Sequence, residues 1–291
     1  MHSRKRTLLL VNPGAGRGEE TLAPVIDRFR RSGLQVTLES FEALPALRQD
    51  IDRLRSTHDQ LVICGGDGSI SSAAGAVMES GLPMGILPMG TANDLARTLQ
   101  IPLELEEAAG VILAGRLRPI DVGTVNGHTF FNIASIGLST ELARRLDARM
   151  KRRFGRLSYA LTAIQVLLSA RRFRARIAAN GHSRTVKTYQ IAVGNGVHYG
   201  GGNVISQAAA IDDGRLDLYS LEMRSLWKLV LMFPAFRAGR HGAWKEVRTA
   251  RSDAFVIETR RPLPVNADGE IVTTTPARFR THPGAVSVFV P

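Results

Sequence analysis

A short run of glycines around one carboxylate, placed directly after an apolar stretch, constrains this chain more than any other feature. The apolar stretch is Leu61-Val62-Ile63, and the run that follows is Cys64-Gly65-Gly66-Asp67-Gly68-Ser69. Glycines let backbone N–H groups approach phosphate oxygens because no Cβ stands in the way, and a helix N-terminus favours negative charge. The carboxylate can hold a divalent cation against the phosphates. The pattern predicts a buried strand, a polyphosphate-binding turn and a helix.

A second run of the same kind supports this interpretation. By itself, the first run is also compatible with a tight turn that binds nothing. About 20 residues later, however, the chain reads Gly85-Ile86-Leu87-Pro88-Met89-Gly90-Thr91-Ala92-Asn93-Asp94. The chain has no Walker A sequence, which excludes a P-loop kinase. We therefore expect a phosphate site built from two glycine-containing loops.

Strand-like and helix-like segments alternate through residues 1–119. The expected strands are Thr7–Val11, Gln35–Phe41, Leu61–Cys64 and Met84–Leu87. The expected helices are Thr21–Ser32, Pro45–Ser56, Ile70–Ser80, Ala92–Leu99 and Leu105–Ala114. Such alternation predicts a doubly wound α/β domain, a parallel sheet with helices on both faces. Ligands of these folds bind beyond the carboxyl ends of the strands, where both glycine runs fall.

The pattern changes near Pro119, and residues 120–283 read as a mainly antiparallel domain with inserted helices. The expected strands are Asp121–Val125, His128–Ile133, Tyr189–Gly194, Leu216–Leu221, Ala254–Thr259, Leu263–Ala267 and Val286–Val290. Asn126-Gly127 is typical of a hairpin turn between the first two. Helical regions are expected at about Thr140–Arg172 and Leu226–Phe236. Whether the last strand, about 284–291, returns to the first domain is left open.

Composition places the chain among ordinary folded proteins. It has 291 residues, of which 44% are hydrophobic and 22% charged, and this allows a core of normal size. The single cysteine, Cys64, excludes an internal disulfide and a cysteine-rich metal site. The apolar run Thr7–Val11 is too short for a secretory signal, and no stretch approaches the roughly 18 apolar residues of a membrane span. A cytoplasmic location is expected.

The positive charge is concentrated in one segment. The formal net charge is +12, and Arg144–Arg176 contains eleven basic residues and one acid, a net of +10. Such a patch fits an anionic membrane surface or nucleic acid, although a solvated helix face is the simpler alternative. Gly155–Arg172 and Trp227–Phe236 place apolar residues beside cations, as at a lipid headgroup boundary, unless these residues pack on the sheet. No recognisable nucleic-acid module is present, so no nucleic-acid partner is expected.

Ordered motifs along nearly the whole chain carry a resemblance to a known family. They are Asn12-Pro13-Gly14-Ala15-Gly16, the two glycine runs, Ile120-Asp121-Val122-Gly123, Asn132-Ile133-Ala134-Ser135-Ile136-Gly137, Gly194-Asn195-Gly196 with Gly200-Gly201-Gly202, Asp212-Asp213-Gly214-Arg215-Leu216-Asp217, and Asp268-Gly269-Glu270. With these motifs the chain resembles the diacylglycerol kinase catalytic family, and more closely the bacterial soluble lipid kinases of the YegS/DgkB-like group. The resemblance implies a nucleotide domain similar to those of NAD kinases and phosphofructokinases, then a β-sandwich domain. ATP would lie in the cleft between them.

The resemblance also assigns roles to individual residues. The implied nucleotide-binding set is Asn12, Ser40, Gly65, Gly66, Asp67, Gly68, Ser69, Ile70, Ser71, Ser72, Thr91 and Asn93. Asp67 would also hold a catalytic Mg²⁺, and Glu270 would act as the base that accepts the proton of a lipid hydroxyl, unless it is a solvated turn residue. Asp121 either caps a turn or works with the metal, and we favour the metal.

Two further points qualify the resemblance. A second, structural Mg²⁺ would bind Asp213 with the backbone carbonyls of Ala210 and Arg215, whereas the alternative is an Asp-Gly turn with no metal. The family usually has Asn-Glu where this chain has Ser71 and Ser72, which puts its affinity for ATP in doubt.

The function expected from the sequence is an ATP- and Mg²⁺-dependent lipid kinase that associates reversibly with an anionic membrane surface. Two alternatives stay open: an NAD-kinase-like phosphotransferase, and a non-catalytic membrane-associated nucleotide-binding module. The sequence does not name the lipid, and a homodimer is compatible with it.

Overall fold

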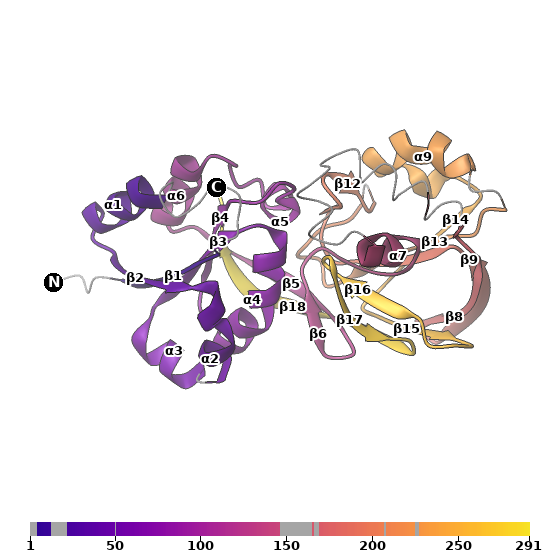
Figure 1. Cartoon of the computed structure of the whole chain (residues 1–291), viewed down its shortest axis with the longest axis horizontal. Helices are drawn as coiled ribbons and strands as arrows, with labels where there is room; N and C mark the ends of the chain where they lie inside the picture. The colour runs from indigo at the N-terminus through magenta and orange to yellow at the C-terminus, as the bar shows by residue number, and fades with distance from the viewer. Residues whose placement is uncertain are drawn as a thin grey trace.

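The computed structural model describes residues 5–12, 22–49, 51–145, 165, 169–206, 208–224 and 227–291. Figure 1 shows two parts side by side, one in which helices surround a sheet and one made mainly of strands. A long pair of strands, β5 and β18, passes from one part into the other (Figure 1).

The first part is a parallel sheet with the strand order β2-β1-β3-β4. Its strands are β1 (Arg6–Val11), β2 (Gln35–Ser40), β3 (Gln60–Gly65) and β4 (Met84–Pro88). Every residue of β3 and β4 is buried. This explains why these strands appear in the sequence as continuous apolar runs, since a parallel sheet is covered on both faces.

Helices cover both faces of this sheet. They are α1 (Ala23–Arg31), α2 (Leu44–Gln49), α3 (Ile51–Thr57), α4 (Asp67–Ser80), α5 (Asp94–Thr98) and α6 (Leu105–Ala114), with a 3₁₀ turn at Phe41–Ala43. In Figure 1, α1 and α6 lie on one side of the sheet, and α2 and α3 lie on the other. The doubly wound, three-layer arrangement predicted for the N-terminal part is therefore confirmed.

One sheet continues through the whole molecule. β5 (Leu117–Val125) and β18 (Ala277–Phe289) pair in antiparallel fashion along their length. Near its end β18 pairs in parallel with β4, with Val288 opposite Met84, and near its start it pairs with β15 (Ala254–Thr259). The expected strand Val286–Val290 is thus the end of a much longer strand that links the two parts.

The second part is a sandwich of two antiparallel sheets. The continuation of the first sheet adds β6 (His128–Phe130), β8 (Phe173–Ala179) and β9 (His182–Thr188). The facing sheet has the order β14-β13-β10-β7-β16-β17, with β7 (Ile133–Gly137), β10 (Gln190–Gly194), β13 (Leu216–Leu221), β14 (Val247–Ser252), β16 (Pro264–Ala267) and β17 (Glu270–Thr274). Buried residues of both sheets form one core between them. This confirms the predicted mainly antiparallel sandwich.

Smaller elements complete this part. They are α7 (Leu138–Arg145), α9 (Trp227–Arg237), a 3₁₀ turn at His241–Ala243, and a short pair of strands, β11 (His198–Tyr199) and β12 (Asn203–Val204). The expected helical region at about Thr140–Arg172 agrees with α7 at its start, and most of its remainder lies outside the described residues. Within the described ranges, no helix combines the length and the apolar character that crossing a bilayer requires.

One expected strand is wrong, and other strands were missed. His128–Ile133 is not one strand, because the chain leaves the first sheet after β6 and enters the facing sheet at β7. The crossing is held by the carboxylate of Asp268, which accepts the backbone N–H groups of Phe131, Asn132 and Ile133. The hairpin of β8 and β9 and the strand β14 were also missed.

Candidate functional site

The two glycine loops touch each other through their backbones. A Cβ on Gly66 would lie 2.9 Å from the Cα of Gly90, and a Cβ on Gly90 would lie 2.6 Å from the Cα of Gly66. The N–H of Met89 donates to the carbonyl of Gly65 at 2.9 Å. Any side chain at Gly66 or Gly90 would force the loops apart, so the close approach explains both glycines.

The first loop leads directly into α4. Gly66 is the N-cap residue and Asp67 is the first residue of the helix, so the free N–H groups of the first turn are available to an anion. From the end of β1, the amide of Asn12 donates to the hydroxyl of Ser69 at 2.8 Å. Asn12 and the Gly65–Ser69 segment therefore come together at the carboxyl ends of β1 and β3, as predicted, while the side chain of Ile70 belongs to the core.

The second loop is shaped by Asn93. Its side-chain oxygen accepts the N–H of Gly90 at 3.0 Å, and its amide donates to the Gly90 carbonyl at 2.9 Å. Asn93 is buried and has a positive φ of 51°, whereas Thr91 is exposed. Ser40 ends β2 and pairs with the end of β1, so it lies at the same edge of the sheet.

Asp67 lies next to a second carboxylate, that of Asp94. The Oδ1 atom of Asp67 accepts the N–H of Leu95 at 3.2 Å. Burial raises the pKa of Asp67, and the charge of Asp94 raises it further. Asp94 is only 5% exposed, and its two oxygens accept the N–H groups of Gly201 and Gly202, each at 2.9 Å. Two crowded carboxylates suit a divalent cation, which prefers oxygen ligands and relieves their repulsion.

Asp121 is engaged in two turns of the second part. It is 2% exposed, and its carboxylate accepts the N–H of Gly214 at 2.6 Å and the N–H of Gly284 at 2.8 Å. Both oxygens thus have backbone partners, as the capping alternative of the sequence analysis requires, and the metal role stays a prediction. The physical reason is that a buried carboxylate needs hydrogen-bond donors, and two turns supply them.

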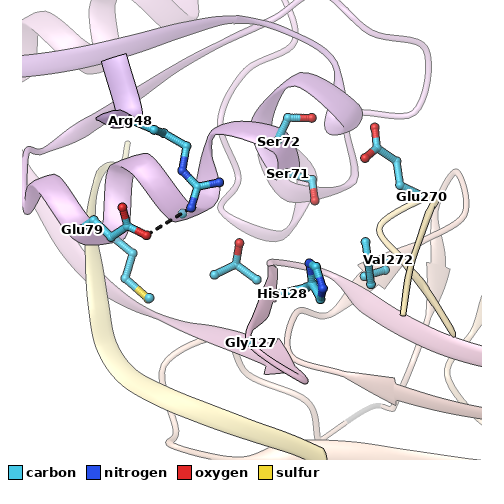
Figure 2. Close-up of a pocket in the computed structure, with 12 residues that line it drawn as sticks. Arg48, Ser71, Ser72, Glu79, Gly127, His128, Glu270 and Val272 are labelled. Carbon is cyan, nitrogen blue, oxygen red and sulfur yellow. Dashed lines mark hydrogen bonds and ion pairs between the residues drawn. The ribbon is translucent and has the colours of Figure 1, made fainter. Parts of the chain in front are cut away.

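Glu270 lies beside a cavity between the two parts. The cavity has a volume of about 510 Å³, and its lining includes residues of α2, α4, β6, β16 and β17. Figure 2 shows Glu270, the first residue of β17, across from Ser71 and Ser72 of α4, with Arg48 and His128 on the remaining walls. Arg48 forms an ion pair with Glu79 at 3.1 Å. The candidate base therefore lines the same cavity as residues that follow the glycine loop by about one helical turn, although it is distant in sequence.

Backbone hydrogen bonds of Asp268 and Gly269 fix the turn that carries Glu270. The N–H of Asp268 donates to the carbonyl of Ile133 at 2.9 Å, and the N–H of Gly269 donates to Asn266 Oδ1 at 3.1 Å. Burial of its carboxylate raises the pKa of Asp268 to about 6, and hydrogen bonds from three backbone N–H groups oppose that rise.

Ser72 of α4 makes a contact within its own helix. Its hydroxyl donates to the carbonyl of Gly68, within the same helix, at 2.8 Å. The Ser72 hydroxyl is therefore used within the helix, and the assignment of Ser71 and Ser72 as nucleotide contacts stays a prediction.

The loop predicted to hold a structural metal has a cation of its own. The guanidinium of Arg251 contacts the carboxylate of Asp213, whose other oxygen accepts the N–H of Arg215 at 2.9 Å. Burial raises the pKa of Asp213, and the charge of Arg251 opposes this. A metal ion here would have to displace Arg251 from Asp213, and the assignment of Ala210, Asp213 and Arg215 as metal ligands stays a prediction. The described ranges contain no cluster of three or more His, Cys, Asp or Glu that could hold a metal.

The predicted membrane segments are only partly described. Most of Arg144–Arg176 falls outside the described residues, although Arg144 pairs with Glu141 at 3.1 Å and Arg176 pairs with Glu258 at 3.3 Å. The second predicted segment coincides with α9, where Leu231 is 70% exposed.

Comparison with known proteins identifies the family of the chain. The model of the diacylglycerol kinase catalytic domain matches residues 6–125, and that of the YegS C-terminal NAD kinase beta sandwich-like domain matches residues 132–290. The chain therefore belongs to the YegS-like branch of the diacylglycerol kinase family, a group of phosphotransferases, as its motifs predicted.

Individual relatives give the same assignment. A protein of Pectobacterium atrosepticum named "Probable lipid kinase YegS-like" is 31% identical, over 100% of this chain and 98% of the relative. A diacylglycerol kinase of Bacillus subtilis is 28% identical, over 94% of this chain and 93% of the relative. The solved structure of a Bacillus anthracis diacylglycerol kinase has the same fold, with a TM-score of 0.81, 24% identity, and coverage of 100% of this chain and 99% of that one.

Sequence reasoning missed three residues of this region. Asp94 was noticed as part of the second glycine run, but no role was given to it. Asp268 was recognised only as a neighbour of Glu270, and Arg48 gave no signal. The contacts that make these residues relevant join positions far apart in the chain, for example 107 residues between Asp94 and Gly201.

Proposed function

We propose that this protein is an ATP-dependent lipid kinase that transfers the γ-phosphoryl group of ATP to a lipid hydroxyl at a membrane surface. The observation that supports this most is the arrangement along α4. The first turn of the helix carries the glycine loop and Asp67, and the next turn lines the cavity beside Glu270. A phosphate donor and a hydroxyl acceptor bound at these two places would meet along one helix.

Phosphoryl transfer requires positioning and neutralisation of charge more than covalent chemistry. The N–H groups at the start of α4 would hold phosphate oxygens of ATP, with Asn12 and Asn93 keeping the two loops in shape. Asp67 and Asp94 are the residues that would hold Mg²⁺, which neutralises phosphate charge when it is bound.

Glu270 would orient the acceptor hydroxyl and take its proton as the oxygen attacks the γ-phosphorus. The bond from that phosphorus to the β,γ-bridging oxygen breaks, and ADP leaves with the negative charge. Glu270 is exposed at the end of a turn, so it can reach an acceptor that enters the cavity from outside.

The membrane surface would be met by α9 and by the basic segment Arg144–Arg176. Leu231 is the most exposed of the large hydrophobic side chains of the described residues, and Arg237 and Arg240 follow it closely. An exposed apolar residue beside cations fits the boundary between lipid headgroups and water. Each basic residue near an anionic surface contributes about 1 kcal/mol to binding, so several together would support reversible docking.

A kinase assay against a panel of lipids tests this function. Vesicles that contain diacylglycerol, phosphatidylglycerol or a long-chain amino alcohol are incubated with labelled ATP and Mg²⁺, and the phosphorylated product is identified by mass spectrometry. NAD is included as a separate acceptor. We expect a phosphate on one of the lipids and none on NAD. Phosphorylation of NAD alone, or ATP binding without transfer to any acceptor, would overturn the proposal.

A further inference from the structure

The loop between β11 and β12 binds a carboxylate of the first part with two backbone N–H groups. The N–H of Gly201 donates to Asp94 Oδ2 and the N–H of Gly202 donates to Asp94 Oδ1, each at 2.9 Å. Gly200, Gly201 and Gly202 have φ of 57°, 82° and 98°, a region that other residues rarely adopt. The three glycines therefore let successive N–H groups converge on one anion, as in the backbone concavities called nests.

A second contact connects the same segment to α5. Oγ1 of Thr98, the last residue of α5, accepts the N–H of His198 at 3.1 Å, and it lies 3.2 Å from His198 Nδ1. His198 is the first residue of β11. Since Asp94 begins α5 and Thr98 ends it, both ends of this helix are bound to the segment that contains the glycines.

The third support of this loop comes from α9. In Figure 1, β12 lies between α5 and α9. Nη1 of Arg237, the last residue of α9, donates to the carbonyl of Gly201 at 3.0 Å. Gly201 therefore accepts a hydrogen bond from a cation and donates one to the carboxylate of Asp94, and hydrogen bonds in such a chain strengthen one another. The chain leads from α9, which carries the exposed Leu231, to the carboxylate beside Asp67.

We propose that Arg237 is a positioning residue for Asp94 and acts through the Gly200–Gly202 loop. By holding the carbonyl of Gly201, Arg237 keeps the two glycine N–H groups directed at Asp94. This carboxylate then stays beside Asp67, in the arrangement that would hold Mg²⁺. The role rests on the proposed function, and it gives Arg237 a task in the phosphate site besides that of a cation near the membrane surface.

Arg240 provides the matched control. It is an exposed arginine shortly after α9, and its backbone N–H donates to the carbonyl of Ala235 at 2.8 Å. Arg237→Ala and Arg240→Ala remove the same charge near the end of α9, so both should weaken binding to anionic vesicles to a similar extent. Of the two, Arg237→Ala is the one that removes the hydrogen bond to Gly201.

Hydrogen exchange without lipid or nucleotide tests the contact. The backbone amides of residues 201 and 202, followed by NMR, should exchange about three- to tenfold faster in Arg237→Ala than in wild type, the effect of one charge-assisted hydrogen bond at an exposed site. They should exchange at the wild-type rate in Arg240→Ala. Unchanged exchange in Arg237→Ala would refute the contact.

Calorimetric titration with ATP at a series of Mg²⁺ concentrations, again without lipid, tests the positioning role. The Mg²⁺ concentration that supports half-maximal ATP binding should rise about two- to fivefold in Arg237→Ala, because Asp94 is then less firmly placed for the cation. It should stay at the wild-type value in Arg240→Ala.

The outcomes separate this role from the alternatives. The role is overturned if exchange accelerates in Arg237→Ala while the Mg²⁺ requirement is unchanged, because the contact is then structural. It is also overturned if both variants raise the requirement equally, because loss of charge then explains the effect. Failure of wild type to bind ATP with Mg²⁺ would refute both the role and the kinase. If wild type phosphorylates no lipid while both measurements give the expected results, the lipid kinase function has failed and the positioning role stands.

Discussion

The substitution Gly66→Ala tests the contact between the two glycine loops. Gly66 has φ −95° and ψ −172°, which any residue adopts, so the only obstacle to alanine is space. The added Cβ would lie 2.9 Å from the Cα of Gly90, and that neighbour is backbone rather than a side chain that can rotate. Overpacking of this kind costs about 1–3 kcal/mol, which lowers the melting temperature by about 2–4 °C for each kcal/mol in a protein of this size.

Gly68→Ala is the matched substitution in the same loop. A Cβ on Gly68 would meet nothing within 4 Å, and the residue lies inside α4, where alanine is favoured over glycine by up to about 1 kcal/mol. We expect its melting temperature to equal or exceed that of wild type. If phosphate oxygens approach this backbone, the same Cβ should still lower the affinity for ATP, by about tenfold or more.

Thermal melting and calorimetric titration with ATP and Mg²⁺ measure the two effects separately. We expect Gly66→Ala to lose stability and Gly68→Ala to lose only its affinity for ATP. This prediction is refuted if Gly66→Ala melts like wild type, because the two loops then do not touch. It is also refuted if Gly68→Ala binds ATP normally, because the loop then does not form the phosphate site.

Three further predictions concern single carboxylates. Asp94→Asn should lower the free energy of unfolding by about 1–3 kcal/mol, since two glycine N–H groups share its carboxylate; urea unfolding with no change would contradict this. Burial raises the pKa of Asp268 from 3.8 to about 6, so the folded state binds the carboxyl proton more tightly than the unfolded state does. As pH rises from about 4 to about 6, the free energy of unfolding of wild type should therefore fall relative to that of Asp268→Asn. Urea unfolding at both pH values measures this difference, and a gain in the relative stability of wild type would contradict the prediction. Because Arg251 already contacts Asp213, a chelator should leave the melting temperature within about 1 °C; a fall of several degrees would support the predicted metal loop instead.

Local patterns were sufficient to predict the N-terminal half and the loop that opens α4. Strands β3 and β4 are buried on every residue, so their apolar runs are unambiguous, and the glycines after β3 lie where backbone must approach backbone. The β8–β9 hairpin was missed for the opposite reason. Arg174 and Arg176 alternate with buried residues of β8, and they were interpreted as the end of the basic segment Arg144–Arg176, although Asn180-Gly181 gave a turn signal.

The tertiary contacts of the candidate site could not be predicted from local pattern. Asp121 had two possible roles in the sequence, and its partners Gly214 and Gly284 lie 93 and 163 residues away. Asp268 accepts N–H groups about as far from it in the chain, at residues 131–133. A buried carboxylate requires hydrogen-bond donors, but only the fold shows which donors it receives.

The most direct test of the central proposal compares binding and transfer in Glu270→Gln. Glutamine keeps the size of the side chain and removes the base, while the glycine loop and Asp67 stay as they are. ATP affinity, measured by calorimetry with Mg²⁺, should stay within about threefold of wild type, and phosphoryl transfer to the lipid identified in the panel should fall by about 100-fold or more. Transfer at the wild-type rate by this variant would contradict the account.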